Sequence, residues 1–211
     1  MEKTSNNIKQ IVTQFLLIVF SVVLGLYLSE RIEERKQRKE SDELLTTIKS
    51  EIKDNLSLLQ VWVPYHREIN KKLDSLSKHP VFIDEFITNK FILLEKLLTK
   101  GTFMGRTPIS DAWDIAKSHP LVVNIDYDKW VIISRIYNQQ ETTFKPAFEM
   151  IALFETKDVN VEKDAKANLE VMSNYFRELV AREDQLMFYY KQAEEILDLS
   201  DKKELNKVIP Q

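Results

Sequence analysis

The sequence predicts an all-α protein, in which one N-terminal transmembrane helix continues into a long helix that packs with further long helices as a helical bundle. Three observations predict this fold. They are an uncharged apolar run near the N-terminus, three later stretches whose apolar residues recur every three or four positions, and only three glycines in 211 residues. We expect an N-terminal tail (1–9), a transmembrane helix (10–29, the apolar run), a juxtamembrane helix (30–43, the charged segment), the helical bundle (44–200) and a C-terminal tail (201–211).

The apolar run has the length and composition of a membrane span. It carries no charge, and its thirteen Leu, Ile, Val and Phe side chains point all round the helix. At about 1.5 Å per residue it reaches roughly 30 Å, the thickness of a bilayer's hydrocarbon core. A core helix would show a polar face, and a cleaved signal peptide would end in small residues where Leu24 to Ser29 offers large ones. We therefore expect an anchor that stays in the lipid bilayer.

The small and polar residues of the apolar run share one helical face, which is a candidate surface for helix pairing in the membrane. They are Gln14, Ser21, Gly25 and Ser29. Small residues four positions apart let two helix backbones approach closely. The alternative is that these residues face lipid without a partner helix.

The charged segment contains no glycine or proline, so the helix is expected to leave the membrane without a hinge. Arg31, Arg35 and Arg38 share a face and are candidates for contact with anionic lipid headgroups, although a simply solvated face would have the same sequence. Lys and Arg are more numerous after the apolar run than before it. This asymmetry favours a cytoplasmic over a periplasmic C-terminal domain.

From residue 44 onward the apolar residues alternate steps of three and four, the pattern of a helix packed in a bundle. The positions are Leu45, Ile48, Ile52, Asn55, Leu59, Trp62, His66, Ile69, Leu73 and Leu76. Pro64 is expected to kink or break this helix, which should end at His79 and Pro80. Asn55 and His66 are candidate functional groups, but hydrogen-bonded core residues are the simpler interpretation.

The middle of the chain predicts shorter elements. We expect a helix within 82–100, followed by a loop over 101–107 that holds two of the three glycines. Thr107 is predicted to cap a short helix with Pro108 at its first position. The apolar residues 121–125 are predicted to be extended.

Two more long helices repeat the apolar spacing. Asp126 should cap the first, Pro146 is a candidate bend in it, and a polar link over 156–160 leads to the second. The positions are Trp130, Ile133, Tyr137, Gln140, Phe144, Ala147, Ile151 and Phe154 in the first, and Leu169, Met172, Phe176, Leu179, Glu183, Leu186, Tyr190, Ala193 and Leu197 in the second.

The composition argues against several functions. A net charge of −3 with mixed signs gives no case for nucleic acid, and the chain has no cysteine for a thiolate or a disulfide. We expect no catalytic activity, no cofactor and no metal ion, because the motifs for phosphate loops, metal ligands and nucleophiles do not occur. Asp111, Trp113, Asp114 and His119 form the densest polar and aromatic cluster, but helix capping and surface exposure explain its aspartates without a site.

The start of the chain resembles a large family of uncharacterised small bacterial single-span membrane proteins. It has the apolar run, then Ile32-Glu33-Glu34-Arg35-Lys36-Gln37-Arg38-Lys39-Glu40, then the helix over 44–59. Residues 111–116 and 128–137 are similar to the central region of that family. The chain departs from it at 118–121, where the family often has a glycine-containing turn. The resemblance implies one membrane span and a helical domain, and it implies no chemistry.

Two functions from different classes fit these features. The first is a membrane-anchored interaction or scaffold module that binds a protein partner or a second copy of the chain. The second is a ligand-sensing bundle that signals through its transmembrane helix to a partner. A buried polar pocket around Asn55, His66 or Gln140 would favour sensing, whereas a dry core with an exposed apolar strip would favour scaffolding.

Overall fold

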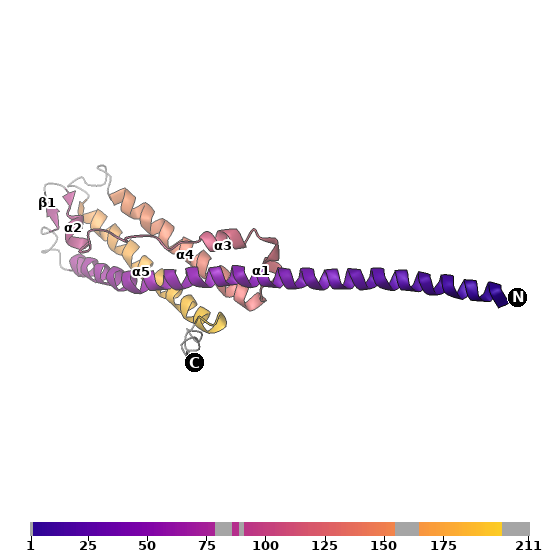
Figure 1. Ribbon diagram of the computed structural model, residues 1–211. Coiled ribbons are helices and arrows are strands. Elements are labelled where there is room, and N and C mark those ends of the chain that lie inside the picture. The colour runs from indigo at the N-terminus through magenta and orange to yellow at the C-terminus, as the bar shows by residue number, and fades with distance from the viewer. Residues whose placement is uncertain (1, 79–85, 89–90, 155–164, 200–211) are drawn as a thin grey trace, which may run out of the picture.

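The predicted all-α fold with a long N-terminal helix is confirmed by a computed structural model, which describes residues 2–78, 86–88, 91–154 and 165–199 (Figure 1). Its elements are α1 (Glu2–Lys78), β1 (Ile87–Thr88), β2 (Phe91–Ile92), α2 (Leu94–Leu97), α3 (Asp111–Ala116), the 3-10 helix η2 (Pro120–Asn124), α4 (Tyr127–Phe154) and α5 (Ala165–Ile196). The link predicted over 156–160 and the tail predicted over 201–211 lie outside the described residues.

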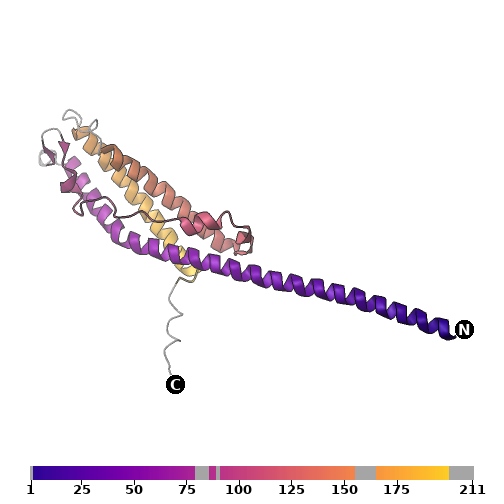
Figure 2. The same ribbon diagram turned by 45° about the horizontal axis from the view of Figure 1, so that its top comes forward.

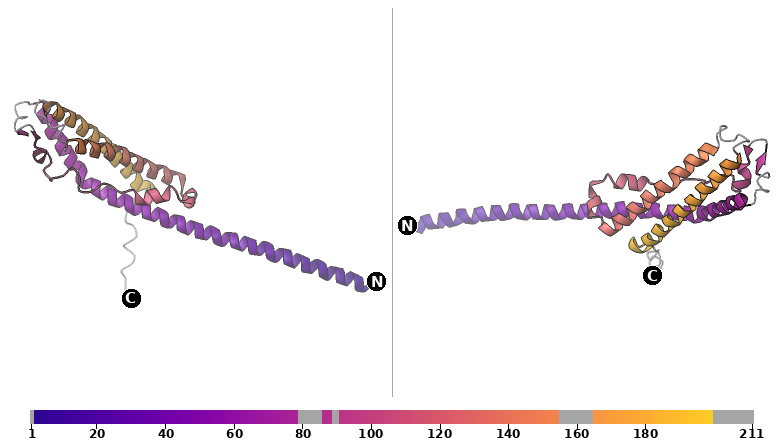
Figure 3. Two further views of the ribbon diagram at one scale, coloured as in Figure 1. Left: turned by 90° about the horizontal axis from the view of Figure 1, so that it is seen from above. Right: turned by 180° about the vertical axis from the view of Figure 1, so that it is seen from behind.

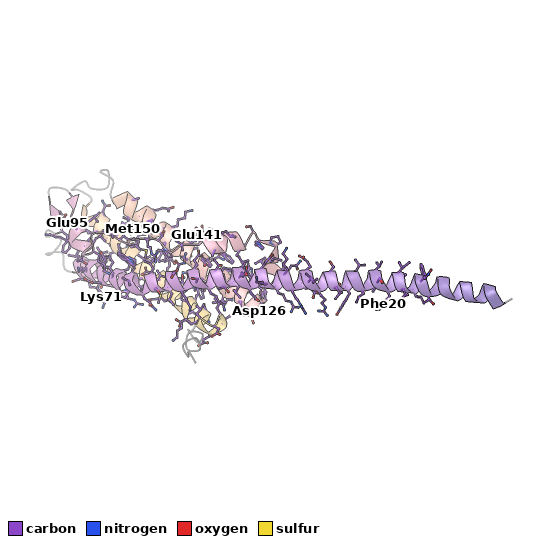
Figure 4. All side chains as sticks on the ribbon, in the orientation of Figure 1. Phe20, Lys71, Glu95, Asp126, Glu141 and Met150 are labelled. Carbon is purple, nitrogen blue, oxygen red and sulfur yellow. The ribbon has the colours of Figure 1, made fainter. Side chains whose placement is uncertain are left out.

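Helix α1 runs in one piece from the apolar run to the far end of the bundle, as the absence of a hinge predicts. Its N-terminal part projects beyond every other element (Figure 1), and residues 13–29 are exposed on all sides. Phe20, for example, is 64% exposed and stands on the bare part of the helix (Figure 4). The apolar run therefore contributes nothing to the bundle core.

Pro64 lies inside α1 without breaking it, so of the two predicted effects a break is wrong. The part of α1 that lies in the bundle bends away from the straight N-terminal part (Figures 2 and 3). Proline removes one backbone N–H from the helix, and Pro64 sits on the exposed face, where water replaces the lost partner. Pro146 is likewise exposed, and α4 continues through it.

The bundle is organised around α5, which packs against both α1 and α4 (Figure 2). The three predicted apolar spacings are confirmed, because their residues form the core wherever the structure describes their side chains. The most deeply buried large side chains include Ile48, Ile52, Leu59, Ile69, Leu73, Ile132, Ile133, Ile136, Phe176 and Tyr190. The apolar spacing and the packing have one cause: a helix that buries one face must place apolar residues every three or four positions.

On the side away from α5, an irregular segment passes between α1 and α4. We call this segment, residues 98–110, the strap. Gly101 turns the chain into it with φ of 73°, in the left-handed region that suits glycine. Phe103 and Met104 enter the core, and a Cβ atom on Gly105 would lie 3.1 Å from Cζ2 of Trp62. The strap thus lies directly on α1.

The helix predicted within 82–100 is present in the described residues of that range only as the single turn α2. Ile87 pairs with Ile92 and Thr88 with Phe91 in an antiparallel hairpin, and only the single turn of α2 follows. β-branched and aromatic residues favour a pleated strand, which fits the pairing at these positions.

Two boundaries near α3 also differ from prediction. The N-cap of α3 is Ser110, so Thr107 is not the cap and Pro108 is not the first helical residue. Residues 120–124 form the 3-10 helix η2 and are not extended, with Pro120 at its start. The predicted cap of α4 is confirmed, because Oδ1 of Asp126 accepts hydrogen bonds from the backbone N–H groups of Asp128 and Lys129.

Candidate functional site

Three buried polar groups of α1 face the strap and α3, and the first is Glu51. One of its carboxyl oxygens accepts a 2.8 Å hydrogen bond from the backbone N–H of Ala112, in the first turn of α3. The other accepts a 2.6 Å hydrogen bond from the hydroxyl of Tyr137 on α4. Burial, and then the bond to Glu51, raise the pKa of Tyr137, which keeps its proton as a donor. Glu51 thus caps α3 from another helix.

One turn further along α1, Asn55 holds the strap by both of its amide atoms. Its Oδ1 accepts from the backbone N–H of Ile109 at 2.9 Å, and its Nδ2 donates to the carbonyl of Ile109 at 2.7 Å. Gln140 of α4 donates to the same carbonyl at 3.1 Å and accepts from the hydroxyl of Tyr190 at 3.0 Å. Strap, α1, α4 and α5 therefore meet in one buried polar layer.

The third group is His66, which is fully buried beside Glu183 of α5. Its Nε2 lies 3.0 Å from the carbonyl oxygen of Phe103, and since a carbonyl only accepts, Nε2 carries a proton. Its Nδ1 lies 2.5 Å from Oε1 of Glu183, and the imidazole stacks on the ring of Phe103. Burial raises the pKa of Glu183, while the hydrogen bond and charge of His66 oppose that shift. Oε2 of Glu183 has no hydrogen-bond partner among the described residues.

These contacts place both Asn55 and His66 in the core, hydrogen-bonded to protein atoms. Glu51 was missed from the sequence, because a glutamate next to the apolar positions resembles a solvated flank. Its available signal was its position, four residues before Asn55 on the same helical face.

Beside this polar region a groove of about 440 Å³ opens to the surface between the strap, α3 and α4. Trp113 stacks on Tyr137 at its base, with ring centroids 5.3 Å apart. Gln140 also reaches its wall, and Asn138 and Glu141 line it from α4; Glu141 is labelled in Figure 4. The groove combines aromatic surface with polar groups of both charges.

The structure brings together only part of the predicted cluster. Trp113 and Asp114 both line the groove, and Asp114 pairs with Lys117 at 2.7 Å. Asp111 is exposed. His119 accepts a hydrogen bond from the backbone N–H of Leu121 and so serves η2. Across the described residues, no group of three His, Asp or Glu side chains is arranged to hold a metal ion.

The predicted pairing face lies on the bare part of α1. Gln14, Ser21, Gly25 and Ser29 are all exposed, and a Cβ atom on Gly25 would meet nothing within 4 Å. The hydroxyl of Ser21 donates to the carbonyl of Leu17, one turn back, so its polarity is satisfied within the helix. A second helix would find this face open.

The three arginines of the charged segment line one hollow of about 460 Å³ on the surface of α1, together with Tyr27, Leu28, Ile32 and Glu34. The shared face predicted for Arg31, Arg35 and Arg38 is therefore present. Nε of Arg31 donates to the hydroxyl of Tyr27 at 3.2 Å.

Comparisons of the chain with models of known families, with curated proteins and with solved structures give no match. The fold and the contacts define a class: an all-α chain in which, among the described residues, one helix is long and apolar enough to cross a membrane, judged by length and composition.

We predict that Asn55→Ala lowers the free energy of unfolding by about 2 kcal/mol, because the Ile109 N–H loses its partner and the Ile109 carbonyl keeps only the hydrogen bond from Gln140. Urea unfolding of the full chain in detergent measures this. Asn138→Ala, an exposed position on α4, is the matched control and should change the value by less than about 0.5 kcal/mol. Equal effects of the two substitutions would contradict the role of Asn55.

The second prediction concerns pH. The pKa of Glu183 is raised above its ordinary value of 4.5, so the folded state keeps a proton that the unfolded state releases. The stabilisation is complete below that ordinary value and is lost as pH rises through the folded pKa. Above that ordinary value the unfolding free energy should therefore fall with rising pH more steeply for the native chain than for Glu183→Gln. Parallel curves in urea titrations would refute this.

Proposed function

We propose that this chain is a single-pass membrane protein whose helical bundle acts as a non-catalytic interaction or scaffold module. One observation carries the proposal: α1 is a single helix whose first part is apolar and exposed on all sides and whose last part forms the core of the bundle. Water does not tolerate such an exposed apolar cylinder, whereas lipid does.

The apolar run could also be a core helix or a signal peptide, and each fits the observations less well. The core helix of a soluble protein would be mostly buried, but none of the apolar window of α1 is. A signal peptide would be cut after small residues, whereas most of residues 24–28 are large and apolar. From residue 13 onward the first buried residue is Ser41, so the bundle stands about 18 Å beyond the end of the apolar run.

The polar core groups favour a scaffold over an enzyme. The hydrogen bonds of these groups are made with protein atoms, mostly of the strap and α3; the groups are Glu51, Asn55 and His66. We therefore propose that the module acts through its surfaces, and that the pairing face receives a partner helix or a second copy. We also propose that the chain belongs to the uncharacterised single-span family and that its bundle lies in the cytoplasm.

The ligand-sensing alternative is favoured by the groove beside Trp113 and Gln140. Its aromatic base and convergent polar groups suit a small molecule, and Gln140 connects its wall to Asn55 on α1. A ligand there would contact the network that joins the strap to the membrane-anchored helix.

A thermal-shift experiment distinguishes ligand sensing from scaffolding. If the bundle senses a ligand, the small-molecule fraction of a cell extract should raise the melting temperature of the purified full chain in detergent. Asn138→Trp, which fills the groove, should lose that rise, and Glu149→Trp, exposed on α4 outside it, should keep it. No rise for the native chain is the result that scaffolding predicts.

The anchor and its pairing face are tested together, because the chain has no cysteine of its own. The native chain should stay in isolated membranes through an alkaline carbonate wash. Gly25→Cys should then form, on oxidation, a disulfide with the same position of a second copy in good yield, since small residues there permit close approach. Val23→Cys, on the opposite side of α1, is the matched control and should crosslink poorly.

Release by carbonate would defeat the anchor itself. Retention with equal yields at positions 23 and 25 would defeat only the pairing face.

A further inference from the structure

We propose that the hollow lined by Arg31, Arg35 and Arg38 is a binding site for the headgroup phosphate of anionic phospholipids. The proposal rests on the proposed membrane anchor and deepens it, because it names the lipid class that the anchor recruits. Three observations carry it: the separation of charge around α1, the depth of the arginines, and the chemistry of the groups that line the hollow.

Charge is segregated around the charged segment. Residues 30–43 hold five Lys or Arg and six Asp or Glu, a net charge of −1. The hollow, however, gathers three arginines and only one carboxylate, Glu34, a net charge of +2. A segment that is slightly acidic as a whole thus presents one locally basic face.

The pairing of the lysines sharpens this separation. Lys36 pairs with Glu40 at 3.9 Å and Lys39 with Glu43 at 3.5 Å, both outside the hollow. Arg31 is partly engaged by Glu34 at 3.4 Å. Arg35 and Arg38 have no carboxylate partner among the described residues, so their guanidinium groups are open to an external anion.

The depth of the arginines matches the headgroup layer. With the apolar run in the hydrocarbon core, Arg31 lies about 3 Å and Arg35 about 9 Å beyond Ser29 along the helix axis. The headgroup region is roughly 5 to 8 Å thick on each side of the bilayer. Arg35, just beyond that region, and Arg38, about 14 Å out, reach it through their long side chains, since arginine extends toward an interface.

The lining of the hollow suits a phospholipid and not only a phosphate ion. Guanidinium groups bind phosphate oxygens in pairs of parallel hydrogen bonds. Arg31 is held in place by the hydroxyl of Tyr27 and lies over its ring, 5.4 Å from the centroid. Tyrosine favours the membrane interface, and Leu28 and Ile32 offer apolar surface to the acyl chains below the phosphate.

The test measures which lipids border the protein. The full chain is reconstituted in phosphatidylcholine bilayers, and electron paramagnetic resonance compares spin-labelled phosphatidylglycerol with spin-labelled phosphatidylcholine. We expect the native chain to prefer the anionic label by about fivefold. Arg35→Gln with Arg38→Gln should bring the preference close to one.

A matched control separates a site from net charge. Lys36→Gln with Lys39→Gln also removes two positive charges from this segment, but outside the hollow. This double variant should keep the preference for the anionic label. Equal losses in both double variants would overturn the proposal, and so would a native chain without preference. Loss of the preference in inorganic phosphate, but not in chloride of equal ionic strength, would also overturn it and assign the hollow to a soluble anion.

The anchor is judged separately, by flotation of the native chain with vesicles of pure phosphatidylcholine. A chain that fails to float loses the proposed function itself. A chain that floats but shows no lipid preference loses only the headgroup site.

Discussion

The strap imposes the central constraint on this bundle, because a segment without regular secondary structure enters the core with backbone groups that still require partners. Helix α1 supplies them from side chains. Glu51 serves Ala112, Asn55 serves Ile109, and His66 serves Phe103. Polar residues therefore occur on the otherwise apolar buried face of α1 because the strap needs hydrogen-bond partners. Each is tolerated there because it is itself hydrogen-bonded.

The residues that meet this constraint lie on the same helix as the apolar run. The residues that hold the strap belong to the helix that carries the apolar run, so no loop separates the lipid-compatible part of the chain from the polar layer in its core. In the proposed scaffold this continuity fixes the bundle rigidly relative to the membrane-proximal helix. In the sensing alternative the same continuity would join the groove to the span.

The long helices could be predicted because burial of one face forces a regular spacing, and Asp126 because a cap acts on its own neighbours. The short elements depend on distant contacts. Thr107 and Pro108 look like a helix start, but Asn55, 54 residues before Ile109 in the chain, holds the backbone there in another conformation. Ile87 and Ile92 were expected in a helix, but they pair across a hairpin, where their β-branched side chains suit a strand. Among the candidate site residues, the sequence placed the arginines on one face but did not reveal the groove, which depends on how the strap lies across α4.

The central place of α5 has a consequence for biosynthesis. It is made after α1 and α4, and its partners on α1 lie far back in the chain: Glu183 follows His66 by 117 residues. The ribosome therefore releases the apolar run well before the bundle can close. Until α5 emerges, the apolar face of α1 that it covers remains exposed. Chaperones are expected to bind a nascent chain in that state.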